Sequence, residues 1–239
     1  MKICVVGYGA MGKLVSSMAK EELACVVAKE SPYQTLEAAP CPFDIIVDFS
    51  HPDNLEMIRT YALKHSIPVL FATTGYTDRQ LEQIEELSKS VPVLRSANFS
   101  LGVILLNRLL KQIVPLLKDD FDIEVTEAHH HYKVDAPSGT AKMFLKTIVD
   151  ETGFEERYDR LGYAPRKPNE IGVHSIRGGS IVGDHEILFC GEDEVIKLSH
   201  HAQSKKIFAV GTLKAARFLL SQEPGSYTME DVLFQKEIA

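Results

Sequence analysis

The sequence predicts an α/β protein in two parts: an N-terminal Rossmann-type dinucleotide-binding domain, and an α+β domain with a mixed sheet. Short β-branched runs alternate with helical patterns through residues 1–100, and the first run ends in a glycine-rich turn, GYGAMG. Such alternation is typical of a parallel sheet covered by helices on both faces. The second half instead contains strand patterns joined by tight turns, which favour an antiparallel or mixed sheet.

The first half is expected to alternate strands with helices throughout. A strand over residues 3–6 leads through the glycine turn into a helix that reaches about Lys20. Thr77 and Gln80, three residues apart, form a capping-box pattern that opens a helix reaching about Lys89. The remaining elements are strands over 24–28, 44–49, 67–72 and 91–94, and a helix over 51–64.

The second half begins with a long amphipathic helix over residues 101–117 and includes a polar connection over residues 153–169. A last helix over 205–220 and the tail return to the first domain. We therefore expect one domain from residues 1–100 with 212–239, and a second from residues 101–211. The other elements of the second half are strands over 122–128, 172–177, 180–190 and 194–200, and a helix over 138–150.

Composition excludes several classes of partner. The chain of 239 residues has a formal net charge of -7, so no basic surface is expected to neutralise the phosphates of a nucleic acid. Basic residues interrupt the longest apolar stretch, and the N-terminal apolar run is too short for a signal peptide. The 4 cysteines show no CxxC spacing, which favours a reducing environment. We expect a cytoplasmic protein with neither nucleic-acid nor membrane partners.

The turn GYGAMG has the spacing G-x-G-x-x-G directly between a strand and a helix. Gly7 permits the tight turn, Gly9 lets the backbone approach a pyrophosphate, and Gly12 lets helix and strand pack closely. A phosphate bound there meets the positive end of the helix. The pattern predicts a dinucleotide site, and the alternative is a tight turn without a ligand.

Lys29 stands about where such domains carry the acidic residue that binds the ribose 2′-hydroxyl of NAD, at a spacing shorter than usual. Lys29 could pair with the 2′-phosphate of NADP, whereas the neighbouring Glu30 could hold the ribose of NAD. A surface lysine without a role is an equal alternative. The choice between NADPH and NADH therefore stays open, with NADPH or dual use favoured.

Residues 127–141 read EAHHHYKVDAPSGTA and concentrate titratable groups beside a turn. His129 and His131 would share one face if the strand continued, but no third ligand follows at a recognisable spacing, so no metal site is expected. A histidine that titrates near neutral pH and a lysine of lowered pKa can both transfer protons, which favours an acid–base site. A solvated polar loop is the alternative.

The same segment offers a cradle for a carboxylate. Pro137 is a helix-initiating residue, and the backbone of residues 138–140 at the helix start presents N–H groups with a hydroxyl added. Asp135 could orient or neutralise Lys133. Cations, acids and an anion cradle within one segment suit a small substrate with two carboxylates.

This segment resembles the E-x-HH-x-x-K-x-D-A-P-S-G-T-A signature of the 4-hydroxy-tetrahydrodipicolinate reductase family, the dihydrodipicolinate reductases of lysine and diaminopimelate biosynthesis. The histidine–lysine run is highly specific to that family, whereas the glycine loop is not. The resemblance extends over nearly the whole chain, through VVGYGAMG, VDFS (47–50), FATTG (71–75), SANFSLGV (96–103), SIRGGSIVGDHEILF (175–189) and HHAQSKKIFAVG (200–211).

The resemblance implies a two-domain homotetrameric oxidoreductase, whose second domain binds substrate and mediates oligomerisation. It would reduce (2S,4S)-4-hydroxy-2,3,4,5-tetrahydrodipicolinate, a cyclic dicarboxylate, to tetrahydrodipicolinate with NADH or NADPH and loss of water. Carried over by position, His129 is the acid–base histidine and Lys133 the proton donor. The substrate-binding positions are His130, Gly139 and Thr140.

The resemblance also assigns cofactor contacts, to which Lys29 is added. They are Gly7, Tyr8, Gly9, Ala10, Met11, Gly12, Ala72, Thr73, Thr74, Ala97, Asn98, Phe99 and Ser100. Two positions depart from the family pattern: Ala72 stands where many members have Gly, and Lys29 stands where many have an acid, which puts strict NAD specificity in doubt. His131 and Tyr132 occupy variable positions and receive no role.

Other functions account for less of the sequence. Another Rossmann NAD(P)-dependent dehydrogenase, acting on an aspartate-derived amino-acid precursor, would share the glycine loop but would not be expected to carry HHHYKVDAPSGT. A redox-sensing regulator would need a DNA-binding module, for which the chain has no basic region. A disulfide-active protein would need a different cysteine spacing.

Overall fold

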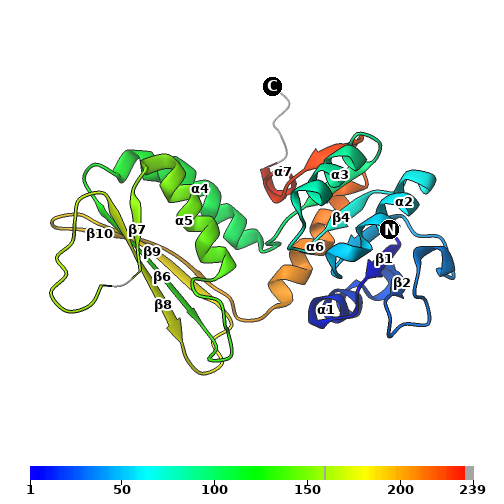
Figure 1. The fold of residues 1–239 in the computed structure, drawn as a ribbon, viewed down its shortest axis with the longest axis horizontal. Helices are drawn as coiled ribbons and strands as arrows, with labels where there is room; N and C mark the ends of the chain where they lie inside the picture. Colours follow the sequence, from blue (N-terminus) through cyan, green and yellow to red (C-terminus); the bar gives the residue numbers. More distant parts are fainter. Residues whose placement is uncertain (159, 235–239) are drawn as a thin grey trace. The chain divides into compact units, whose positions relative to one another are not determined.

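The computed structural model describes residues 1–158 and 160–234, and the chain divides into two compact units (Figure 1). The first unit contains Met1–Leu101 and the chain from Lys206 onward, and the second contains Gly102–Lys205. Helix α6 (Lys206–Leu219) lies wholly in the first unit. The chain therefore returns to the first unit before residue 212, the boundary that the sequence predicted. The predicted boundary would have divided this helix.

The first unit is built on a six-stranded parallel sheet in the order β11-β5-β4-β3-β1-β2. Because β2 and β3 flank β1, the strand order reverses there, which is where dinucleotide-binding sheets hold their ligand. At the end of β2, an isolated parallel bridge pairs Val27 with Tyr33. The strands are β1 (Ile3–Val6), β2 (Leu23–Val27), β3 (Ile45–Asp48), β4 (Val69–Phe71), β5 (Pro92–Arg95) and β11 (Gly225–Tyr227).

Helices cover both faces of this sheet. α1 (Ala10–Ala19) packs against β1, β2 and α6, whereas α2 (Leu55–His65) and α3 (Asp78–Ser88) contact each other, and their apolar residues join the core that contains Cys4 and Val6 (Figure 1). With both faces covered, strands such as β1 are buried at every position. The capping box predicted for α3 is confirmed: Thr77 Oγ1 accepts from the Gln80 N–H at 3.3 Å, and Gln80 Oε1 accepts from the Thr77 N–H at 3.0 Å. The shorter helices are η1 (Lys20–Glu22), η2 (Leu36–Ala38), η3 (Pro52–Asn54) and α7 (Met229–Phe234).

The second unit is built on a five-stranded sheet in the order β10-β9-β6-β8-β7, and the mixed sheet expected from the sequence is confirmed. β6, β8 and β7 run parallel to one another, whereas β9 runs antiparallel to β6 and β10 runs antiparallel to β9. Helices α4 (Leu101–Leu117) and α5 (Gly139–Thr152) cover one face, where their apolar side chains share a core with the strands (Figure 1). The strands are β6 (Asp122–His129), β7 (Glu155–Arg157), β8 (Glu170–Arg177), β9 (Asp184–Cys190) and β10 (Val195–His201).

Three short elements differ from the expectation. β7 lies inside the predicted polar connection, and β11 and α7 lie in the predicted tail. β9 begins at Asp184 rather than at residue 180. The two short strands carry too few residues to show a period of their own, and each is defined by its pairing with β8 or β5.

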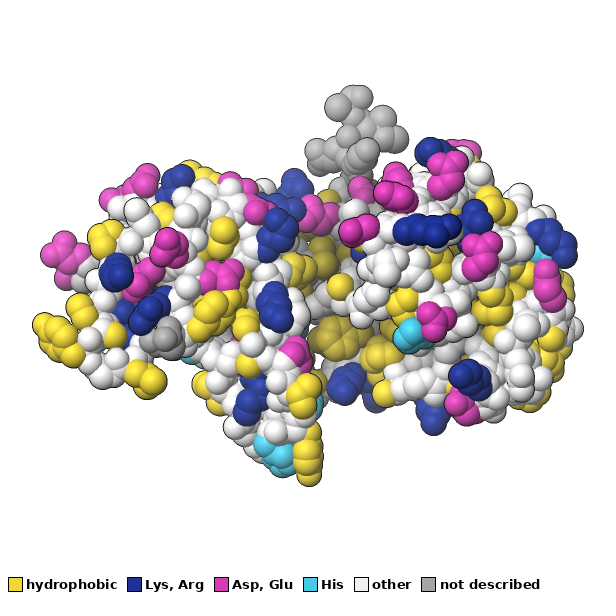
Figure 2. Space-filling view, viewed as in Figure 1, with side chains coloured by type: hydrophobic (Ala, Val, Ile, Leu, Met, Phe, Trp, Pro, Cys, Tyr) yellow, Lys and Arg dark blue, Asp and Glu magenta, His cyan; other side chains and the backbone are white. Residues whose placement is uncertain are grey.

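The surface is mixed in charge. On the face shown in Figure 2, acidic and basic side chains are interspersed, and no large area of one sign is visible. Within the described ranges, no helix combines the length and the apolar character needed to span a bilayer.

Candidate active site

The histidine–lysine segment lies between a strand and a helix of the second unit. β6 ends at His129, and α5 begins at Gly139. Ser138 is the N-cap of α5, and its Oγ accepts a hydrogen bond from the Ala141 N–H at 3.1 Å. The helix start at residues 138–140 that the sequence predicted is therefore present, with Gly139 exposed in its first turn.

His129 contacts a buried acid that the sequence analysis did not assign. Its Nδ1 lies 2.6 Å from Glu127 Oε2, and the Glu127 side chain is fully buried. Arg177 donates to both oxygens of this carboxylate, at 2.9 and 2.6 Å. Burial raises the pKa of Glu127, but hydrogen bonds led by the one from Arg177 outweigh burial, so the pKa is lowered. Glu127 is therefore ionised at neutral pH.

The acid–base candidate His129 is itself largely enclosed. Burial lowers its pKa, and the hydrogen bond with Glu127 opposes this effect without cancelling it. On its far side the ring lies against Gly183, where an added Cβ would stand 3.1 Å from Nε2. His129 is thus held by Nδ1, and Nε2 is the atom left to exchange a proton.

Lys133 reaches a neighbouring carboxylate. Its Nζ donates to Asp135 Oδ1 at 2.6 Å, as the sequence suggested. The Lys133 side chain is 20% exposed, and its hydrogen bond lowers the pKa of Asp135. The lysine therefore has a counter-ion in the structure while its side chain stays accessible.

His130 lies in a pocket of about 620 Å³ together with Lys205, which the sequence analysis did not single out. His131 and Tyr132 line the same pocket, and Tyr132 is 80% exposed. Nδ1 of His130 is buried and has no partner among the described residues. A histidine and a lysine that line one pocket suit an anionic ligand.

His185 is a further residue that the sequence analysis did not single out. It pairs opposite Glu127 in the sheet, and its Nε2 lies 2.9 Å from Ser138 Oγ. Its ring meets that of His129 edge-on, with centroids 5.3 Å apart. Burial lowers the pKa of His185 to about 4, so the ring is neutral near neutral pH.

The glycine loop of the first unit fits a pyrophosphate. Gly7 has φ +97°, and an added Cβ would stand 2.3 Å from the Phe49 carbonyl oxygen. A Cβ on Gly12 would stand 2.2 Å from the Gly7 carbonyl oxygen, whereas nothing lies within 4 Å of one on Gly9. The first turn of α1 carries no acidic residue that would repel a phosphate, and Gly9 at its N-cap is exposed.

The remaining residues of the glycine loop are accessible. Tyr8 and Ala10 are exposed and Met11 is half-buried. Lys13 Nζ lies 5.1 Å from the centroid of the Tyr8 ring and adds a cation beside the loop. Lys29 lies exposed just beyond β2.

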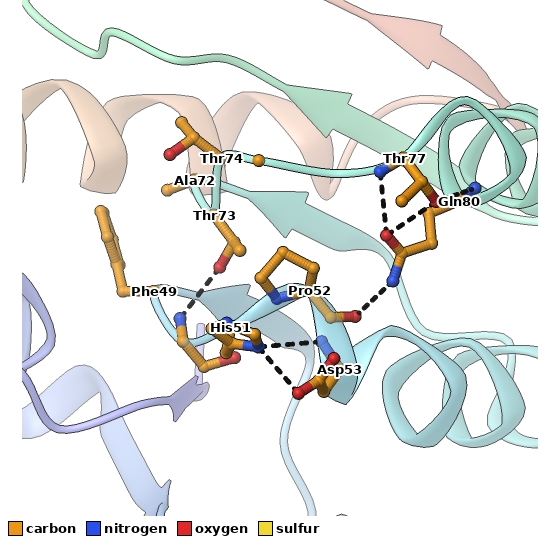
Figure 3. Close-up of a pocket in the computed structure, with 11 residues that line it drawn as sticks. Phe49, His51, Pro52, Asp53, Ala72, Thr73, Thr74, Thr77 and Gln80 are labelled. Atoms are coloured by element: carbon orange, nitrogen blue, oxygen red, sulfur yellow. Dashed lines mark hydrogen bonds and ion pairs between the residues drawn. The ribbon is translucent and has the colours of Figure 1, made fainter.

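Ala72, Thr73 and Thr74 line a pocket of about 440 Å³ beyond the ends of β3 and β4 (Figure 3). Thr73 Oγ1 accepts from the Ser50 N–H at 2.9 Å, which joins the loops that follow these two strands. Beneath them, the fully buried Asp48 accepts from Ser50 Oγ at 2.5 Å and from the Tyr76 hydroxyl at 2.9 Å. Burial raises the pKa of Asp48, although these hydrogen bonds oppose it.

The last predicted cofactor stretch follows β5. The Phe99 ring lies 6.2 Å from that of Phe49, between centroids, so this stretch borders the loop after β3. Asn98 Oδ1 accepts from the Ser100 N–H at 2.8 Å, and Ala97 is exposed. The three predicted cofactor stretches thus follow β1, β4 and β5 of one parallel sheet.

Comparisons with known proteins cover both units. A family model described as "Dihydrodipicolinate reductase, N-terminus" matches residues 1–99, and one described as "Dihydrodipicolinate reductase, C-terminus" matches residues 102–233. Curated 4-hydroxy-tetrahydrodipicolinate reductases are similar over their whole length. The one from Exiguobacterium sibiricum is 42% identical, with 99% of this chain and 98% of that protein covered, and the one from Clostridium novyi is 42% identical, covering 95% and 96%.

Solved structures share the fold. A dipicolinate-bound dihydrodipicolinate reductase from Paenisporosarcina sp. TG-14 has a TM-score of 0.76 and 21% identity, covering 95% of this chain and 97% of that one. The diaminopimelate (DAP) dehydrogenase of C. glutamicum has a TM-score of 0.54 and 11% identity, covering 100% and 99%. Family models on both units and relatives of this identity show that the chain belongs to the dihydrodipicolinate reductase family.

Proposed function

We propose that this protein is an NAD(P)H-dependent oxidoreductase that reduces 4-hydroxy-tetrahydrodipicolinate to tetrahydrodipicolinate, with loss of water, in lysine and diaminopimelate biosynthesis. One observation carries the proposal. The segment of residues 127–141 joins an enclosed histidine, a paired lysine and a helix start within the unit that the C-terminal family model matches. The relatives that are 42% identical carry the name 4-hydroxy-tetrahydrodipicolinate reductase.

The chemistry of each side chain in the second unit determines the role that we assign to it. We assign one substrate carboxylate to the start of α5, at Gly139 and Thr140, where helix amides attract anions. His130 lines a pocket together with Lys205 and is assigned to bind the substrate there. Lys133 offsets the negative charge that develops in the ring on reduction, and Lys133 or Nε2 of His129 donates the proton.

The cofactor assignment rests on the first unit. The nicotinamide cofactor, when bound, would supply the hydride. Gly7, Gly9 and Gly12 leave the pyrophosphate an approach to the positive end of α1. Residues 72–74 and 97–100 follow neighbouring strands of the same sheet and are assigned to the rest of the dinucleotide. The exposed cation of Lys29 favours NADPH or dual use over strict NAD specificity.

A coupled assay tests the proposed reaction. Pyruvate and aspartate semialdehyde are converted by the preceding synthase, and the absorbance of NADH or NADPH is followed after this protein is added. We expect oxidation of at least one cofactor that depends on both substrates and on the synthase. Oxidation without pyruvate would indicate a dehydrogenase acting on the semialdehyde itself. No oxidation with either cofactor would contradict the proposal.

We also propose that the protein is a homotetramer that assembles through the second unit. The face of its sheet opposite α4 and α5 carries partly exposed apolar side chains, including Ile176 and Val195, each about half exposed. The family resemblance implies a tetramer assembled through this domain, and association on this face would remove these apolar side chains from water. Light scattering coupled to size exclusion tests the proposal: four times the 26.6 kDa chain mass is expected, and a monomer would contradict it.

A further inference from the structure

We propose that Glu127 is the positioning residue of this site, and that its one buried carboxylate fixes both the orientation of His129 and the start of the carboxylate cradle. The inference rests on the proposed function, in which His129 transfers a proton and α5 binds a substrate carboxylate. It adds two residues, Glu127 and its partner Arg177, to those assigned above.

The first step is the burial of Glu127. It lies two positions before His129 on β6, so both side chains point to the helix-covered face of the sheet. A fully buried carboxylate costs several kcal/mol of desolvation unless it is paired and hydrogen-bonded. Both oxygens here are used: Oε2 meets His129 and Arg177, and Oε1 meets Arg177 and the Ser138 N–H at 3.2 Å. A hydrophobic residue could fill this place in a purely structural core.

The second step is the tautomer of His129. An ionised carboxylate can only accept hydrogen bonds, so the 2.6 Å contact requires a proton on Nδ1. Neutral His129 then carries its lone pair on Nε2, and its protonated form donates from Nε2. Arg177 neutralises the carboxylate, so Glu127 orients the ring without holding it permanently charged.

The third step links the histidine to the cradle. The same pair of side chains contacts the loop between β6 and α5 at its beginning, middle and end. Glu127 holds His129 and the Ser138 N–H, while Arg177 Nη2 donates to the Asp135 carbonyl oxygen at 2.6 Å. The proton-transfer atom and the anion-binding helix start are therefore fixed to one charge pair. Loss of that pair should affect both chemistry and substrate binding.

Two-bond ¹H–¹⁵N correlation spectra of the histidine rings test the tautomer in the unaltered protein. The His129 signals are identified by their loss in His129→Gln. We expect the Nδ1–H form when His129 is neutral. An Nε2–H form would overturn the proposal, and this reading needs neither substrate nor turnover, so it stands apart from any failure of the proposed reaction.

Glu127→Gln tests the coupling. A Gln side chain has one acceptor oxygen where Glu127 has two. We therefore expect the Nδ1–H population of His129 to fall, kcat to drop by about 10- to 100-fold, and KM to rise. Glu127→Asp keeps the charge and should recover part of kcat. Glu56→Gln is the matched control, because it removes an exposed carboxylate that pairs with Arg59 in the other unit. Wild-type kcat and KM in a folded Glu127→Gln protein would contradict the proposal.

Discussion

The Ser138 hydroxyl lies 2.9 Å from Nε2 of His185, so the cap of α5 rests on a histidine that is only 5% exposed. Nδ1 of His185 is buried and has no partner among the described residues. The hydroxyl also caps α5 by accepting from the Ala141 N–H. A protonated His185 ring would have no hydrogen-bond acceptor for its Nδ1–H among the described residues, which agrees with the lowered pKa of His185.

This histidine predicts a loss of stability in acid. The folded-state pKa of about 4 lies below the ordinary value of 6.5, so between these pH values the unfolded chain binds a proton that the folded protein does not. The stability contributed above pH 6.5 is lost as the pH falls toward 4, by up to about 3 kcal/mol. Urea unfolding from pH 7 to pH 4.5 measures the slope, which should flatten in His185→Gln. Equal slopes in the two proteins would contradict the assignment.

Gly7→Ala should lower the stability of the protein, whereas Gly9→Ala should lower its affinity for NADPH. Gly7 combines a positive φ with a close carbonyl oxygen, so Gly7→Ala should lose about 2 kcal/mol or more in the free energy of unfolding. Gly9 has φ -70° and open space at its Cβ, so Gly9→Ala should unfold like the wild type but bind NADPH more weakly. Urea unfolding and NADPH fluorescence titration measure the two effects. Unchanged NADPH affinity in Gly9→Ala would remove the glycine loop from the cofactor site.

Gly183→Ala should disturb His129 without unfolding the protein. The new Cβ would stand 3.1 Å from Nε2, so the ring must move by a few tenths of an ångström and strain its contact with Glu127. We expect kcat to fall about tenfold with little change in the thermal midpoint. Gly178→Ala is the matched control, because a Cβ at Gly178 meets nothing within 4 Å. If Gly183→Ala and Gly178→Ala had equal kcat, the placement of His129 Nε2 beside Gly183 would not matter for catalysis.

Local signals in the sequence predicted the parts of the molecule that depend on few residues. The glycine spacing placed the turn after β1, and Thr77 with Gln80 placed the start of α3. Each of these features is completed within a turn or a helix start, so neighbours in the sequence determine it. The site residues assigned by resemblance remain predictions about function.

Features that depend on strand register could not be predicted in this way. Glu127 and Arg177 are 50 residues apart and meet only because β6 and β8 pair in parallel, with His129 opposite Arg177. His185 reaches Ser138 only because β9 places it opposite Glu127. A glutamate in EAHH reads as an ordinary polar position of a strand, and nothing nearby in the sequence indicates its burial.

We propose that Lys29 and Glu30 decide the choice between NADPH and NADH. If Lys29 meets the 2′-phosphate, Lys29→Ala should weaken NADPH binding about five- to tenfold and leave NADH binding unchanged. Glu30→Ala should weaken NADH binding if the carboxylate holds the ribose. Fluorescence titration of each variant with each cofactor measures the four affinities. Unchanged affinities throughout would make Lys29 a surface residue.

The central proposal is that the proton donor of the reaction is His129 or Lys133, and not the neighbouring His131. Its most direct test is kcat with saturating substrate and cofactor for His129→Gln, Lys133→Ala and the control His131→Gln. We expect the first two to lose about 10²- to 10⁴-fold in kcat, and His131→Gln to stay within about twofold of the wild type. Wild-type turnover in both His129→Gln and Lys133→Ala would contradict the account.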